Sequence, residues 1–309
     1  MRLRPGRPDI DSYRDRFDVA AASPQSAFAV VWLGVSTLLV DDGVTALLTD
    51  GFFSRPSLLD VALRRLSPSI ARIEESLSRA GISRLDAVLP VHTHYDHALD
   101  SAVVAGRTGA CVVGGASAAN IARGQGLSES RIVVADPGNE MTFGTFDVTL
   151  IESEHCPPDR FPGVITESVV MPAKASAFRC GEAWSTLIRH RTSDRRLLIQ
   201  GSAGFRSGAL SGQRADVAYL GVGQLGVQPI DYIEQYWRET VRAVGARRVV
   251  LIHWDDFFRP LTAQLRALPY AADDLDVTMR VLGRLAESDG VALHLPTLWQ
   301  AADPCAGGE

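Results

Sequence analysis

The chain has 309 residues, of which 46% are hydrophobic and 22% are charged. This ordinary globular composition supplies enough apolar side chains for one large domain or two closely packed halves. The formal net charge of -5 argues against nucleic acid or an anionic membrane as the main partner. No apolar run approaches the roughly 20 residues of a membrane-spanning helix, and the four cysteines form no CxxC pair. We therefore expect a cytoplasmic protein.

The predicted elements alternate between strands and helices in a single domain over residues 27–300. The charged leader 1–26 lacks the apolar core of a signal peptide, and residues 301–309 form a tail. Three apolar runs separated by turn residues predict a meander of strands at 27–33, 37–40 and 44–48. Apolar residues at helical spacing predict an amphipathic helix over 70–80, and a buried strand over 85–91 follows it. Further strands are predicted at 110–113, 132–134, 146–151, 185–189, 196–200, 217–220 and 249–252. Further helices are predicted at 101–105, 116–123, 232–244 and 261–268. The pattern indicates a mixed α/β fold.

Residues 156–184 interrupt this pattern. The segment holds four prolines and shows no clear hydrophobic period. Such a long irregular stretch inside a domain is typical of a functional loop. We expect a lid beside the site that determines the choice of substrate.

Histidines gather where predicted strands end. Five of the seven lie at or just after such ends: His92, His94, His97, His155 and His253. Residues two apart on an extended segment point to the same side, so His92 and His94 can converge on one ion while Asp96 and His97 face another. Imidazoles with a carboxylate suit Zn²⁺ best, with Mn²⁺ and Fe²⁺ as alternatives. A bound metal lowers the pKa of water to about 7 and supplies hydroxide, so no side-chain nucleophile is needed.

The run His92-Thr93-His94-Tyr95-Asp96-His97 resembles the HxHxDH motif of the metallo-β-lactamase superfamily. The segments Trp32-Leu33-Gly34-Val35-Ser36 and Leu48-Thr49-Asp50-Gly51-Phe52 resemble the opening strands of its ascorbate-6-phosphate lactonase-like branch. The resemblance covers most of the chain and implies a four-layer αββα sandwich with the site at one edge of its two sheets. Histidine at position 94 is typical of hydrolytic members, whereas the redox di-iron members carry glutamate there.

The resemblance also implies which residues bind the ions. One ion is assigned to His92, His94 and His155, and the other to Asp96, His97 and His253. Asp96 and His97 are the predicted catalytic residues, and Asp96 would orient the attacking water and accept its proton.

One position departs from the family pattern. Where an aspartate usually bridges both ions, after a strand that ends in glycine, this chain has Ser202. A neutral hydroxyl is a much weaker ligand than a carboxylate, so the second site should be weakened and a single-metal enzyme can result. Asp255 or Asp256, shortly after His253, is a hypothetical source of the missing charge.

Several residues near the motif have competing interpretations. Asp50 either orients a ligand histidine or caps a turn before Gly51. Core packing is the expected role of four others: Cys156, Trp254, Phe257 and Phe258. His190 and His294 are expected to lie outside the site.

These features predict a metal-dependent hydrolase that cleaves an ester, lactone, amide or phosphodiester bond of a small-molecule substrate. The alternative is a non-catalytic or regulatory metal-binding protein of the same fold, because Ser202 replaces the bridging carboxylate. A nuclease is disfavoured by the net acidity and by the lack of a recognisable nuclease domain. The number of ions, one or two, and the oligomeric state stay open.

Overall fold

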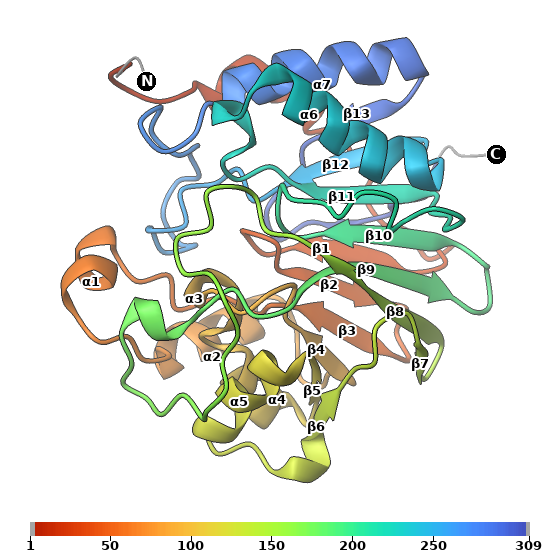
Figure 1. Cartoon of the computed structure of the whole chain (residues 1–309). Coiled ribbons are helices and arrows are strands. Elements are labelled where there is room, and N and C mark those ends of the chain that lie inside the picture. The colour runs from red at the N-terminus through yellow and green to blue at the C-terminus, as the bar shows by residue number, and fades with distance from the viewer. Residues whose placement is uncertain (1–3, 307–309) are drawn as a thin grey trace.

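The computed structural model describes residues 4–306, and its strands form two seven-stranded sheets (Figure 1). In the first sheet the strands follow the order β14-β1-β2-β3-β4-β5-β6. The antiparallel meander predicted from the turn residues forms β1 to β3, and parallel strands continue the sheet from there. The strands are β1 (Ala29–Trp32), β2 (Leu38–Asp41), β3 (Ala46–Thr49), β4 (Ala87–Leu89), β5 (Cys111–Gly114), β6 (Ile132–Val134) and β14 (Ala301–Ala302).

The second sheet has the order β13-β12-β11-β10-β9-β8-β7. Its strands are antiparallel from β7 to β10 and parallel from β10 to β13. They are β7 (Glu140–Phe143), β8 (Phe146–Ser153), β9 (Ala183–His190), β10 (Arg196–Gln200), β11 (Val217–Gly221), β12 (Arg248–Ile252) and β13 (Ala292–His294).

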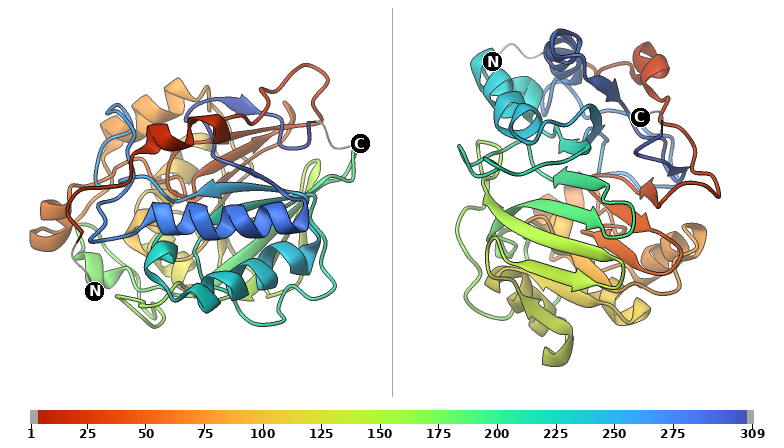
Figure 2. Two further views of the ribbon diagram at one scale, coloured as in Figure 1. Left: turned by 90° about the horizontal axis from the view of Figure 1, so that it is seen from above. Right: turned by 90° about the vertical axis from the view of Figure 1, so that its right-hand side faces the viewer.

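Helices cover the outer faces of both sheets, which gives four layers. Figure 2 shows α6 and α7 side by side over the second sheet, while α2, α4 and α5 lie against the first. The helices are α1 (Leu58–Leu63), α2 (Ile70–Arg79), α3 (Tyr95–Ala98), α4 (Ser101–Thr108), α5 (Ala116–Gly124), α6 (Ile230–Trp237) and α7 (Leu275–Asp289). Short 3₁₀ turns occur at Ile10–Arg16, Glu129–Arg131, Ala175–Ala177 and Leu225–Val227, and a π turn at Arg238–Arg242 extends α6. The α/β sandwich expected from the sequence is confirmed.

The main core lies between the sheets. Trp32 and Leu47 from the first sheet and Leu150, Ile188 and Leu220 from the second are all at most 1% exposed and belong to one cluster. At roughly 1.5–3 kcal/mol for each fully buried large apolar side chain, this cluster supplies much of the drive for the sheets to pack. The packing places the ends of β4, β8 and β12 at one edge of the sandwich.

Residues 261–268 do not form the predicted helix. The segment begins with a turn and continues as irregular chain, and an isolated bridge joins Asp255 to Ala267. Its leucines have helical spacing, but Pro260 and Pro269 flank it, and Asp256 N–H donates to Arg266 C=O. A backbone pairing with the preceding loop therefore replaces the helical hydrogen bonds.

The longest helix, α7, was not among the predicted elements. Its start and end nevertheless follow ordinary signals: the Asp274 side chain accepts from Val277 N–H, and Gly290 adopts the left-handed conformation at the other end. None of the helices in residues 4–306 is long and apolar enough to cross a bilayer.

The segments before and after the predicted domain contact each other. Ala302, on β14, pairs with Val30 of β1 and forms a bridge with Ala21.

Candidate metal centre

The motif histidines lie on a buried loop that leaves β4. His92 is 1% exposed and His97 is 0% exposed, so both rings are withdrawn from solvent. His94 precedes the short helix α3, and its carbonyl accepts hydrogen bonds from the backbone N–H groups of His97 and Ala98. This turn presents Asp96 and His97 beside the two earlier histidines.

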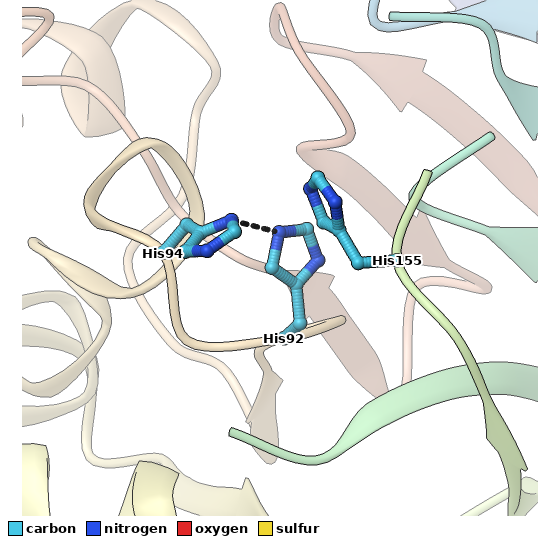
Figure 3. A group of neighbouring side chains, drawn as sticks. All are labelled: His92, His94 and His155. Carbon is cyan, nitrogen blue, oxygen red and sulfur yellow. Dashed lines mark hydrogen bonds between the residues drawn. The ribbon is translucent and has the colours of Figure 1, made fainter. Parts of the chain in front are cut away.

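Three imidazoles form the first group of potential ligands. His92 Nε2 and His94 Nδ1 are 3.2 Å apart, and the His155 ring lies 4.8 Å from that of His92 between centroids. His155 follows the end of β8, so it comes from the other sheet. Figure 3 shows the three rings side by side, two from the loop after β4 and one from the chain after β8. One potential ligand atom from each side chain lies within 4.8 Å of the others.

Asp96, His97 and His253 form the second group, again with ligand atoms within 4.8 Å of one another. Asp96 Oδ2 is 3.6 Å from His97 Nε2 and 3.5 Å from His253 Nε2. His253 follows β12 directly. The rings of His92 and His97 are 3.9 Å apart between centroids, so the two groups are adjacent. The structure therefore brings together all six residues that the sequence singled out.

Hydrogen bonds to the opposite ring nitrogen orient two of the imidazoles. His155 Nδ1 lies 2.6 Å from Cys156 C=O, and His97 Nδ1 lies 2.8 Å from Asp50 Oδ2. A proton held on Nδ1 leaves Nε2 as the nitrogen with a free lone pair. Within residues 4–306, His97 Nε2 is buried and has no hydrogen-bond partner. A buried ring nitrogen without a partner, in a set of imidazole and carboxylate donors, fits a divalent cation such as Zn²⁺.

The electrostatics of the first group favour neutral rings. Burial and then the neighbouring imidazoles lower the pKa of His92 well below its ordinary value and that of His155 to about 4. Burial likewise lowers the pKa of His94. Neutral imidazole is the form that binds a metal, so these rings do not need to lose a proton near pH 7.

The second group carries the negative charge. Burial raises the pKa of Asp96, but the neighbouring His97 and His253 outweigh this effect and hold that pKa well below its usual range. Burial also opposes protonation of His97, whereas the carboxylates of Asp50 and Asp96 raise its pKa. Asp96 is therefore ionised at neutral pH and available as a ligand.

Asp50 occupies the position of an orienting group. Its Oδ1 accepts from Val91 N–H at 2.9 Å, and its Oδ2 accepts from Ser36 Oγ at 2.6 Å. The carboxylate is 0% exposed and is thus fixed on both oxygens against His97. Of the two interpretations drawn from the sequence, the structure has the contact with a histidine that is a potential ligand.

Ser202 and the two aspartates considered as a source of extra charge all have other partners. Ser202 Oγ accepts from Cys156 N–H at 3.0 Å. Asp255 contacts Arg55 Nη2 at 2.5 Å and accepts from Val35 N–H at 2.9 Å. Asp256 pairs with Arg7 and Arg266. Neither aspartate belongs to a group of potential metal ligands in the described part of the chain.

The aromatic residues near His253 pack against the core, as expected. Trp254 packs against Trp32 at 5.2 Å between ring centroids. Phe257 packs against a smaller buried cluster and also meets the His253 ring edge-on at 5.5 Å. His190 and His294 lie elsewhere, paired with Asp42 and Asp18 respectively.

Sequence reasoning missed Asp159. Its Oδ1 lies 3.1 Å from His94 Nε2 and also accepts from Phe161 N–H. The only local signal is an acidic residue in a proline-rich loop, which does not indicate a partner 65 residues away. A cleft of about 450 Å³ also opens beside His155. Its walls include Glu154, Pro157, Phe205, Arg206 and Tyr232.

Solved structures share this architecture at low sequence identity. Igni18, a metallo hydrolase from Ignicoccus hospitalis KIN4/I, is 13% identical with a TM-score of 0.53, over 88% of this chain and 96% of its own. The metallo-β-lactamase fold protein YhfI from Bacillus subtilis is 14% identical with a TM-score of 0.51, over 88% and 97%. CmlA, a diiron β-hydroxylase from Streptomyces venezuelae, is 15% identical with a TM-score of 0.55, over 90% of this chain and 54% of its own.

These likenesses establish the fold. The chain has the four-layer metallo-β-lactamase sandwich that its histidine motif led us to expect. No protein-family model matches the sequence, and a search of curated proteins finds no match either.

Proposed function

We propose that this protein is a metal-dependent hydrolase that acts on a small molecule. One observation carries the proposal: six side chains from three distant segments gather into two adjacent groups of potential ligands at one edge of the sandwich. Burying so many polar rings together costs free energy unless they gain partners. A cation is the partner that this set of donors suits.

Zinc is the proposed ion, with Mn²⁺ and Fe²⁺ as alternatives. His92, His94 and His155 would hold one ion, and Asp96, His97 and His253 a second. A bound divalent cation lowers the pKa of water to about 7 and polarises the oxygen of the attacked group. Asp96, ionised and buried beside these rings, would orient the attacking water and accept its proton.

The cleft beside His155 is the proposed place for the substrate. Phe205 and Tyr232, whose ring centroids are 5.3 Å apart, give it an apolar wall, and Glu154 and Arg206 give it polar groups. Such a cleft suits a small organic molecule. The bond cleaved would be an ester, lactone, amide or phosphodiester. The lactone is included because the opening strands resemble the ascorbate-6-phosphate lactonase-like branch.

Elemental analysis of the purified protein, combined with a substrate panel of these four bond types, tests the proposal. We expect at least one equivalent of zinc, manganese or iron and turnover on at least one bond type. The variant Asp96→Asn should lose at least about 100-fold in rate, the lower range for a general base. The ligand variant His92→Gln has a matched control in His294→Gln. His294 lies on β13, outside the site, and pairs with Asp18. Protein without stoichiometric metal would refute the proposal.

A non-catalytic metal-binding protein is the second candidate, and Ser202 favours it. The serine hydroxyl already accepts a hydrogen bond from Cys156 N–H, so a bridging carboxylate is replaced by a neutral, occupied group. Stoichiometric metal with no turnover on the whole panel would support this candidate over the hydrolase.

A further inference from the structure

The lid is attached to the loop that carries His92 and His94. Thr93 N–H donates to Cys180 C=O at 2.8 Å, and Thr93 Oγ1 donates to Arg179 C=O at 2.5 Å. The two ends of the lid also bind each other, because Cys180 N–H donates to Phe161 C=O at 2.8 Å. The two ends of the lid and the loop that carries His92 and His94 are therefore joined by hydrogen bonds into one unit.

Among the described lid residues, Asp159 is the one whose side chain lies within hydrogen-bond distance of an imidazole nitrogen. Its Oδ1 is 3.1 Å from His94 Nε2, while His94 Nδ1 faces His92. The same oxygen accepts from Phe161 N–H at 3.0 Å, which fixes the carboxylate to the lid. A ring that binds an ion through Nδ1 keeps its proton on Nε2, and a carboxylate is a strong partner for that proton.

We propose that Asp159 is a positioning residue that orients His94 toward the first ion and thereby couples metal binding to the closed state of the lid. The inference rests on the metal-binding part of the proposed function. Coupling between two equilibria is reciprocal. An ion that favours this orientation of His94 therefore also stabilises the lid contact, and loss of the contact weakens the binding of the ion.

The same neighbourhood offers one competing arrangement. His94, Asp159 and Cys180 have potential ligand atoms within 4.8 Å of one another and could hold an ion of their own. His94 would then have to bind one ion through each ring nitrogen and give up both ring protons. A hydrogen bond from Nε2 to Asp159 requires no such loss, so we assign the carboxylate to orientation.

Metal titration of three variants tests the assignment. In Asp159→Asn the shape is kept and the charge is lost, and we expect the first site to bind Co²⁺ or Zn²⁺ about 10- to 100-fold more weakly, the usual effect of removing such a partner. In Asp50→Asn the second site should weaken instead, because Asp50 holds His97. Glu167→Gln, an exposed acid in the same lid, is the matched control and should titrate like the wild type.

The cobalt absorption bands report which site fills, so a general loss of structure is distinguished from a change at one site. If Asp159→Asn and Glu167→Gln have the same affinities and the same bands, the proposal is wrong. Three ions per chain, reduced by one in Cys180→Ser, would establish the competing arrangement and would also overturn the proposal.

Hydrogen exchange tests the coupling to the lid. The amides of Cys180 and Gly181, which donate to Phe161 and Gly163, should exchange several-fold faster in the wild type after the metal is removed with a chelator. In Asp159→Asn their exchange should be fast with or without metal. Exchange in the wild type that does not respond to metal would overturn the coupling. None of these measurements uses turnover, so a protein that passes them and hydrolyses nothing would refute only the proposed hydrolase activity.

Discussion

Replacement of Arg55 by methionine should cost a large part of the stability of this protein. The Arg55 guanidinium and the Asp255 carboxylate form an ion pair in which the side chains are 1% and 0% exposed. Arg55 Nε also donates to Arg259 C=O at 2.6 Å, and Asp255 Oδ1 accepts from Val35 N–H. Arg55→Met would leave the Asp255 carboxylate buried with only one hydrogen bond.

Breaking a buried pair by removing one partner typically costs about 3–5 kcal/mol, because the remaining charge has no compensation. This is comparable to the lower end of the usual unfolding free energy of about 5–15 kcal/mol. The double variant Arg55→Met/Asp255→Asn removes both charges and keeps an acceptor for Val35 N–H. It should therefore recover more than half of the loss.

Urea denaturation of the metal-free protein, followed by circular dichroism, measures both effects. The control is Arg64→Met, which removes an exposed i,i+4 pair with Asp60 and should change the unfolding free energy by at most about 0.5 kcal/mol. If Arg55→Met lowers the unfolding free energy no more than Arg64→Met does, the buried ion pair does not stabilise the protein.

The same variants decide the role of Asp255. Val35 C=O accepts from His253 N–H at 2.8 Å, so the ion pair supports the backbone that carries a candidate ligand. This role predicts that Asp255→Asn lowers stability in the absence of metal. A carboxylate that compensates for Ser202 predicts instead the loss of a bound ion with unchanged stability of the metal-free protein.

Three further variants have outcomes that follow from local geometry. Ser202→Asp introduces a carboxylate at the predicted bridging position and should raise the binding affinity for the second ion by about tenfold, which corresponds to 1.4 kcal/mol. A chelator competition measures this affinity, and an unchanged value would contradict the prediction. Gly204→Ala places a Cβ against the Glu154 carbonyl and the His155 backbone, so the first site should weaken in a cobalt titration, whereas Gly106→Ala, with open space around it, should not. Burial raises the pKa of Asp273 to about 7 against the opposing backbone donors, so the folded protein binds more protons than the unfolded chain between about pH 4 and 7, and stability falls as the pH rises through this window. In thermal unfolding, the stability of Asp273→Asn minus that of the wild type should be larger at pH 8 than at pH 5. An equal difference at both pH values would count against this reasoning.

Short-range patterns in the sequence account for four of the six candidate ligands, because the geometry of these four is local. His92, His94, Asp96 and His97 lie within six residues, and one loop and one helical turn bring them together. Most strands were predicted because apolar runs between turn residues have few alternatives in a sandwich, but the short strands β7, β13 and β14 were not predicted. The segment 261–268 shows the limit of this reasoning, since its leucine spacing fits a helix while backbone pairing with Asp256 determines its conformation.

The contacts that sequence reasoning missed are those between distant segments. Asp159 reaches His94 across 65 residues, and Arg55 reaches Asp255 across 200. An aspartate after a ligand histidine has the same local appearance whether it faces an ion or an arginine. Only the packing of the two sheets distinguishes these cases, and it assigned Asp255 to Arg55.

These distant contacts also bear on what Ser202 means for the centre. Asp96 is the only carboxylate in the two ligand groups assigned to the ions, but Asp50 stands behind His97 and Asp159 behind His94. A carboxylate that accepts the second ring proton makes an imidazole a stronger donor, so each group has a negative charge on the far side of a candidate ligand ring. The first group gains this charge from the lid and the second from the buried turn after β3. With serine at the predicted bridging position, the negative charge would lie outside the pair of ions, and we expect the affinity of the first ion to depend on the contact between Asp159 and His94.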